Sequence, residues 1–187
     1  MAGFWTGNQH GVTEPKRAYK FVAQFGTATD GGEMDSLHMQ EWVIKRVAKP
    51  SFTITETAHQ FLNWTFYYPG RVEWNTIDVT LVDPMNPDTA VVLMNHLTQH
   101  GWITPTGYAA SAGDPRSRST VSKNPASSGI GLFSIKQLDS AGDVIEHWEL
   151  KHPFITNVTF GDLAYDSEEL NEITMTLRFD WAEMVPL

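Results

Sequence analysis

The sequence predicts a mainly β protein with antiparallel strands, one helix and one long loop in a single domain. Apolar and polar residues alternate in several segments, and this two-residue period is typical of half-buried antiparallel strands. Only one segment has the three- and four-residue apolar spacing of a helix. A stretch past the middle has neither pattern. The length of 187 residues fits one ordinary domain.

The clearest predicted strand lies near the carboxyl terminus. Its apolar residues alternate with threonine, arginine and aspartate, and they are Ile173, Met175, Leu177, Phe179 and Trp181. We therefore expect one continuous core strand with these five side chains on its buried face. Shorter alternating runs predict further strands at 19–25 and 77–81.

Two hairpins are expected from turn residues between strand segments. The segment 139–143 separates a run containing Phe133 from a return strand that Pro153 closes. A second hairpin joins 51–57 to 61–68, with the turn expected at 58–60. The Pro69-Gly70 pair is then expected to turn the chain again.

One helix is predicted over residues 87–100. Asn86 is a suitable cap, Pro87 fits the first turn and Gly101 is placed to end the helix. The segment 102–129 is rich in serine, glycine and proline, and we expect a long loop there. Residues 1–17 are expected to form a flexible amino-terminal segment.

Composition excludes several classes of protein. The net charge of −9 argues against direct affinity for nucleic acid, which depends on lysine and arginine contacts to phosphates. The absence of cysteine excludes disulfide frameworks, thiolate metal sites and cysteine nucleophiles. No segment approaches the roughly 20 apolar residues of a membrane span, and the amino terminus lacks a signal-peptide pattern. We expect a protein without membrane insertion that is made and kept in a cytosol.

No constellation of residues predicts catalysis. His96 and His100 have a spacing that suits a metal ion, but no third ligand accompanies them, so solvated helix-end histidines are the favoured interpretation. Asp83, Asn86 and Asp88 form a poor calcium loop because the glycine pivot and the terminal glutamate are missing. Phosphate-binding glycine loops and the Gly-x-Ser-x-Gly pattern do not occur. We expect no enzyme, no metal and no cofactor.

The order of segments in the middle and carboxyl-terminal parts is more specific. The segments, in order, are 47–50, 68–71, 74–82, 148–158, 160–163, 166–167 and 171–181. They resemble the tail tube protein family of contractile phages, in which a strand, a Thr-Asn-Val segment, a Gly-x-Leu and an acidic turn precede a final alternating strand. The resemblance covers roughly residues 18–101 and 130–184. The region near Asp30 and the segment 102–129 depart from it.

The resemblance implies both a fold and a function. It implies two packed antiparallel sheets, as a β-sandwich or barrel of the phage tail tube type, with one flanking helix. It also implies rings of six subunits that stack into the inner tube of the tail, inside a contractile sheath. The partners would be further copies of the chain and the sheath, baseplate and tail-terminator proteins, in a virion assembled in the cytoplasm of a bacterial host. Genomic DNA would pass through without specific binding.

Two segments are candidates for contacts within such a tube. The hairpin 51–68 is expected at the inner wall or the subunit joint, and we expect a net negative channel that does not trap phosphates. Its candidate residues are Thr53, Thr55 and Thr57 on one face and Glu56 on the other. The loop 102–129 is expected to make the axial contacts between rings. Its candidate residues are Tyr108, Arg116, Arg118 and Lys123.

Three alternatives stay open. A ring protein of a related contractile injection or secretion machine would have the same fold, and so would a baseplate or tail-end protein. From a different class, a small-ligand-binding β-barrel or sandwich enzyme would require a deep apolar pocket with convergent polar groups.

Overall fold

The computed structural model describes residues 15–26, 41–86, 88–99, 101–102, 121–166 and 168–186. The elements within these ranges are β1 (Phe21–Phe25), a 3-10 turn η1 (Glu41–Val43), β2 (Ile44–Val47), β3 (Phe52–Phe61), β4 (Trp64–Trp74), β5 (Ile77–Val82), α1 (Thr89–Gln99), α3 (Lys123–Ile130), β6 (Phe133–Leu138), β7 (Val144–Lys151), β8 (Phe154–Thr159), β9 (Glu172–Arg178) and β10 (Trp181–Val185).

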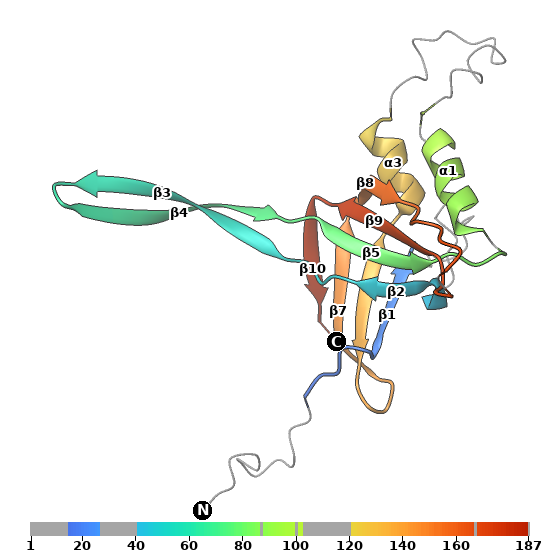
Figure 1. Ribbon diagram of the computed structural model, residues 1–187. Helices are drawn as coiled ribbons and strands as arrows, with labels where there is room; N and C mark the ends of the chain where they lie inside the picture. The colour runs from blue at the N-terminus through green and yellow to red at the C-terminus, as the bar shows by residue number, and fades with distance from the viewer. Residues whose placement is uncertain are drawn as a thin grey trace, which may run out of the picture.

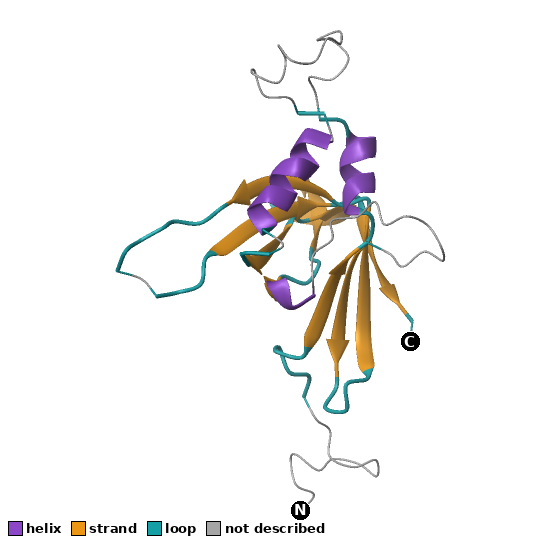
Figure 2. Ribbon diagram, turned by 90° about the vertical axis from the view of Figure 1, so that its right-hand side faces the viewer, coloured by secondary structure: helices purple, strands orange, loops and turns teal. Residues whose placement is uncertain are grey.

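Two four-stranded antiparallel sheets form the body of the protein. Sheet A has the strand order β1-β6-β7-β10, and sheet B has the order β2-β5-β9-β8. The strands of the two sheets run across each other, and both helices lie on the side of sheet B that faces away from sheet A (Figures 1 and 2). Strands β3 and β4 pair only with each other. The predicted mainly β class with two packed antiparallel sheets is confirmed.

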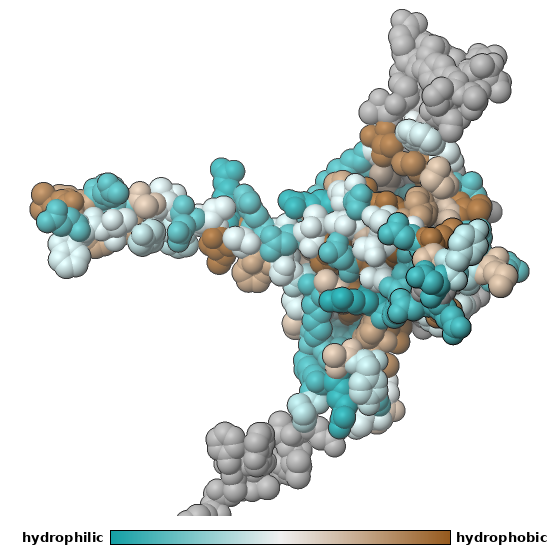
Figure 3. Space-filling model, viewed as in Figure 1, coloured by the Kyte–Doolittle hydropathy of each residue, from teal (hydrophilic) through white to brown (hydrophobic). Residues whose placement is uncertain are grey.

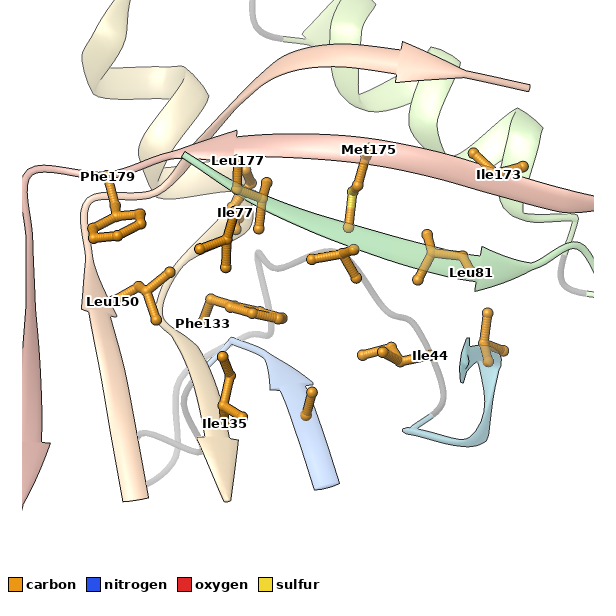
Figure 4. Packing of buried hydrophobic residues seen from close by; sticks show 14 of the residues in the cluster. Ile44, Ile77, Leu81, Phe133, Ile135, Leu150, Ile173, Met175, Leu177 and Phe179 are labelled. Atoms are coloured by element: carbon orange, nitrogen blue, oxygen red, sulfur yellow. The ribbon is translucent and has the colours of Figure 1, made fainter. Parts of the chain in front are cut away.

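The core lies between the sheets and follows from the alternation in the sequence. Side chains on one face of β5 and β9 point toward sheet A, where those of β6 and β7 meet them (Figure 4). The central residues are at most 2% exposed, and they are Ile77, Val79, Leu81, Phe133, Ile135, Leu150, Ile173, Met175 and Leu177. Full burial of each such side chain contributes about 1.5–3 kcal/mol.

The carboxyl-terminal alternation does not belong to one strand. Strand β9 ends at Arg178, and the chain then turns a corner into β10, which pairs with β7 of sheet A. Phe179 is buried at this corner, but Trp181 lies on β10 and is 39% exposed. The prediction that Trp181 continues the core strand is therefore wrong. The two-residue alternation in the sequence continues without a break from β9 into β10, so periodicity alone cannot show that the chain changes sheets.

The hairpin after residue 51 is longer than predicted. Strand β3 continues through the expected turn at 58–60, and the chain reverses at Leu62–Asn63, where Leu62 has a φ of 54°. The Pro69-Gly70 pair does not turn the chain. It lies inside β4, where Pro69 pairs with Glu56, and Gly70 and Arg71 form a bulge opposite Thr55. A Cβ on Gly70 would lie 2.4 Å from the Thr55 hydroxyl oxygen, so glycine permits this close approach. Both turn predictions are wrong.

The first helix begins two residues later than predicted. The Asp88 carboxylate accepts a hydrogen bond from the Val91 backbone N–H (3.1 Å), so Asp88 takes the capping role expected of Asn86. The helix ends at Gln99, before Gly101 at a φ of 118°.

The second helix, α3, lies within the segment 102–129 that was expected to be loop. Its sequence, Lys-Asn-Pro-Ala-Ser-Ser-Gly-Ile, contains few strong helix formers, and its buried residues Ala126 and Ile130 stabilise it by tertiary packing. The prediction of a loop is therefore wrong from Lys123 onward. The flexible segment expected at 1–17 is likewise anchored at its end, because Lys16 Nζ donates to Glu146 (2.5 Å).

The β6–β7 hairpin forms where the sequence predicts it. The Asp139 carboxylate accepts hydrogen bonds from the backbone N–H groups of Ala141, Gly142 and Asp143 at 2.8, 2.8 and 2.9 Å. These bonds hold the pKa of Asp139 below its ordinary value, and the bond from Asp143 has the largest effect. The turn residues therefore act through local hydrogen bonding, as their composition indicates.

Candidate assembly surfaces

The hairpin of β3 and β4, here called the arm, extends away from the body (Figure 1). Every residue of β3 is exposed, and so is every residue of β4 except Trp74. Many of the exposed side chains are large and apolar, and they are Phe52, Ile54, Phe61, Leu62, Trp64, Phe66, Tyr67, Tyr68 and Val72. Apolar residues are visible both at the tip and closer to the body (Figure 3). The free subunit leaves this surface in contact with water.

The apolar stripe of the arm changes faces at the bulge. Residues directly opposite in an antiparallel pair share a face, and neighbours along a strand alternate. In the outer half, one face carries the pairs Phe61–Trp64, His59–Phe66 and Thr57–Tyr68. In the inner half, the opposite face carries the pairs Ile54–Val72 and Phe52–Trp74. The extra residue in β4 therefore gives the arm two separate apolar surfaces on opposite faces.

The root of the arm is attached to the body by aromatic packing. The Trp74 ring lies 5.5 Å from the ring of Phe52 and 5.9 Å from that of Phe179, measured between centroids. The Asn75 backbone N–H donates to the Ser51 carbonyl oxygen (2.9 Å), which closes the hairpin at its base.

A charged cluster holds the chain just before the arm. Lys49 Nζ donates to Glu146 Oε1 (2.7 Å), and Lys16 Nζ donates to Oε2 of the same carboxylate (2.5 Å). The Trp148 indole donates a third hydrogen bond to Glu146 (2.6 Å). Together these donors lower the pKa of Glu146 to about 2, and Lys16 has the largest effect. The Glu146 side chain is only 10% exposed, so it connects β7 firmly to the amino-terminal segment and the arm root.

The structure places the threonines of the candidate hairpin site on β3 of the arm. Thr53, Thr55 and Thr57 share one face, and Glu56 lies on the other. The Thr55 hydroxyl accepts a hydrogen bond from the Arg71 backbone N–H (2.8 Å), so this side chain contributes to the bulge. None of these residues belongs to sheet A or sheet B.

The candidate residues for contact between rings are separated. Tyr108, Arg116 and Arg118 lie outside the described residues. Lys123 is in the first turn of α3, and its Nζ donates to both Asp180 carboxylate oxygens at 2.7 Å. This bond, assisted by His152, lowers the pKa of Asp180. Lys123 therefore binds the body of its own subunit.

The outer face of sheet A is polar, and its ionic side chains have hydrogen-bonding or ionic partners within the face. Lys151 Nζ lies 2.7 Å from a Glu149 oxygen and 3.5 Å from a Glu183 oxygen, and the bond with Glu149 raises the pKa of Lys151. Lys136 Nζ donates to Gln24 Oε1 (3.2 Å). The two lysines, Lys136 and Lys151, and the two glutamates, Glu149 and Glu183, have a formal charge sum of zero. The edges of this sheet, β1 and β10, carry no further strand within the described residues.

The described ranges contain no group of three His, Asp or Glu side chains placed to hold a metal ion. His96 is buried in α1 at 9% exposure, so the expectation of a solvated side chain is wrong for this residue. His100 lies outside the described residues. Within those ranges, no helix combines the length and apolar character that crossing a bilayer requires.

Sequence reasoning missed two of these surfaces. The arm was expected as a short hairpin, although the aromatic run on both sides of Asn63 was a signal of unusual apolar exposure. The open edges of sheet A had no signal in the sequence, because strand order depends on pairing between distant segments.

Comparison with known proteins supports a fold, but not a sequence family. No protein-family model matches the chain, and no curated protein sequence matches it either. A chain of the anti-feeding prophage cap, described as a tube-terminating cap, superposes with a TM-score of 0.64 at 16% identity, over 97% of this chain and 98% of that one. A chain of the six-fold symmetrised baseplate of the same system gives a TM-score of 0.63 at 15% identity, over 93% and 97%.

A third similar structure comes from another machine. A chain of the sheath/tube terminator of the extracellular contractile injection system PVC, in its extended state, gives a TM-score of 0.59 at 15% identity, over 94% of this chain and 100% of that one. The likeness spans nearly the whole length of all these chains. The protein therefore has the fold of the tube, cap and terminator components of contractile injection systems, and the predicted tail tube fold is confirmed.

Proposed function

We propose that the chain is a structural, non-enzymatic subunit that forms rings of six, and that these rings stack into the inner tube of a contractile phage tail. Sheath, baseplate and tail-terminator proteins would be its partners in the virion, and DNA would pass along the channel. The observation that carries the proposal is the arm, a large apolar surface with open strand edges that the free subunit cannot bury. Such surfaces are typical of protein interfaces.

The open edges of sheet A supply a way to close the ring. Joining β1 of one copy to β10 of the next would continue the antiparallel sheet around the ring and leave no free edge. The contact is head to tail, and a head-to-tail contact that closes gives cyclic symmetry. The number six is supported by the six-fold symmetry of the baseplate from which one similar chain comes.

In this arrangement the outer face of sheet A lines the channel, and the arm belongs to the subunit joint. The balanced charges on that face offer no cluster of free lysine or arginine to bind phosphates. Acids and bases balance on this face, so here DNA would pass because nothing binds its phosphates. The excess acid of a net negative channel would have to come from other parts of the ring. Arg116 and Arg118 keep their proposed role between rings.

Electron microscopy of the purified protein tests the proposal. We expect hexameric rings, and tubes at high concentration, with six-fold symmetry in end-on averages. Sedimentation across concentration and salt supplies a second readout, because ring formation follows mass action. A subunit that remains monomeric under all these conditions would contradict the proposal.

A second candidate is a baseplate or cap component at one end of the tube. It is supported because the similar chains described above come from a cap, a baseplate and a terminator. The same micrographs discriminate, since a terminal component gives single or paired rings where a tube protein gives tubes of variable length. A related injection or secretion machine is compatible with either result. Co-expression with a candidate sheath protein would identify the machine.

A further inference from the structure

We propose that the tip of the arm binds a second copy of the chain in a hollow beside the β8–β9 connection. The hollow is lined by residues 161–165 and 169–172 and has a volume of about 590 Å³. This inference rests on the proposed function, because it assigns the partner of the arm. It concerns the segment containing Phe160-Gly161-Asp162-Leu163, which the channel and the sheet edges do not use.

The hollow is surrounded by apolar side chains that the subunit leaves exposed. Leu163 is 89% exposed, Leu170 is 70% exposed, and Tyr165 is fully exposed. Single exposed leucines are common on protein surfaces, but apolar side chains that gather at one place mark an interaction site. A space of this size accommodates one or two large side chains.

The shape of the hollow is fixed by close packing of its backbone. Gly161 has a φ of 79°, and a Cβ there would lie 2.6 Å from the Glu172 carbonyl oxygen. The Asp83 backbone N–H donates to the Asn171 carbonyl oxygen (3.0 Å), and the Asn171 amide donates to the Asp83 carboxylate (3.1 Å). The connection is therefore bonded to the end of β5 through Asn171, and Gly161 packs closely against Glu172 at the start of β9.

The arm tip has side chains that fit such a hollow. Phe61 is 60% exposed, Leu62 is 85% exposed and Trp64 is 70% exposed, and the three are adjacent at the turn. Burial of an aromatic side chain removes about 150–250 Å² from water. The tip is also neutral: residues 57–68 contain no Asp, Glu, Lys or Arg. The acids at the hollow, including Asp162 and Glu169, therefore do not repel it.

The positions of the two surfaces require a second copy. The arm leaves sheet B where β5 begins at Ile77, whereas the hollow is bonded to Asp83, just after β5 ends. The arm and the β8–β9 connection lie at opposite sides of the body (Figure 1). One subunit thus cannot bring its own tip to its own hollow. Two copies can do so head to tail, and each addition leaves one tip and one hollow free for the next.

Engineered disulfides test this contact, because the chain contains no cysteine. The double variant Leu62→Cys/Leu163→Cys places one thiol on the tip and one at the hollow, both at highly exposed positions. Under mild oxidation of the assembled protein, we expect a ladder of covalent multimers on a non-reducing gel. The matched control Leu62→Cys/Ser140→Cys moves the second thiol to the exposed β6–β7 turn, and we expect no ladder beyond a dimer.

Two outcomes separate this inference from the proposed function. Rings or tubes that form normally without a ladder would overturn the tip contact while leaving the tube role intact. Failure of the unmodified protein to form any assembly would overturn both.

A second pair of variants gives an independent readout. Trp64→Asp should leave the thermal unfolding of the subunit unchanged and should raise the protein concentration needed for assembly at least tenfold. Thr65→Asp, on the opposite face of the arm, should assemble within about twofold of the unmodified protein. Equal assembly by Trp64→Asp and the unmodified protein would overturn the contact.

Discussion

Strand β9 and the arm carry the same kind of apolar alternation, but the structure uses it in opposite ways. On β9, Ile173, Met175 and Leu177 are fully buried against sheet A. On the arm, Phe66 is 49% exposed and Trp64 is 70% exposed, with no second layer over either. The period of a sequence therefore shows that a strand has an apolar face, but it does not show which molecule covers that face. The free energy of burial is realised within the subunit for β9 and, on our proposal, only in the assembly for the arm.

The largest expected contrast comes from truncating one aromatic side chain in each region. Phe179→Ala should destabilise the isolated subunit by about 3–5 kcal/mol, because Phe179 is 3% exposed and its removal leaves a cavity. Phe66→Ala should change the same stability by less than about 0.5 kcal/mol, since its ring is half exposed. Chemical denaturation of dilute, unassembled protein measures both. Similar losses for the two variants would show that the arm is packed on the body in solution.

The second contrast concerns the charged cluster at the arm root. Glu146→Gln should cost on the order of 2 kcal/mol at pH 7, because the pKa of Glu146 is lowered to about 2 and its lysine partners are half exposed. A depressed pKa stabilises the fold fully above the unfolded value near 4.5, and this contribution is lost as the pH falls toward 2.

Stability curves from pH 7 to pH 2 test that dependence. The unmodified protein and Glu146→Gln should converge as the pH falls through this range. A difference that stays constant with pH would show that the carboxylate charge is not the cause. Lys49→Met removes one donor and should give a smaller loss with the same direction of pH dependence.

Much of the body could be predicted from the sequence, because local pattern and final burial agree there. The alternation at Ile77, Val79 and Leu81 and the turn at Asp139 depend on short-range rules, and the structure follows them. The corner at Asp180 and the bulge at Gly70 could not be predicted. Each depends on a distant partner, Lys151 in the first case and Thr55 in the second.

The candidate sites were harder to predict for the same reason. An interface is formed by segments that meet only after folding or assembly, so the sequence showed the aromatic run of the arm but not that the subunit leaves it exposed. Lys123 looked like a loop cation because the helix that contains it is stabilised by tertiary packing.

A smaller effect is expected at the bulge. Gly70→Ala should strain the arm by about 1–2 kcal/mol, because its Cβ would lie 2.4 Å from the Thr55 hydroxyl oxygen and 2.9 Å from the Thr55 carbonyl oxygen. The strain should be local, so amide exchange should accelerate in β3 and β4 while the unfolding of the body is unchanged. Adding Thr55→Ala removes the hydroxyl contact and should restore part of the protection. Full restoration would show that the backbone contact is not tight.

The smallest effect is expected at Lys123, where it decides between two roles. As an exposed ion pair with Asp180, Lys123 should contribute about 0.2–1 kcal/mol to the subunit, so Lys123→Ala should lower stability slightly and leave ring stacking unchanged. The pKa of Asp180 is lowered by the pair, so this contribution should be present above the ordinary aspartate value and disappear as the pH falls below it. Arg116→Ala and Arg118→Ala provide the comparison, because those arginines keep the proposed axial role. If Lys123→Ala shortened tubes as strongly as the arginine variants while leaving the melting temperature unchanged, Lys123 would belong to the contact between rings, and its bond to Asp180 would be incidental.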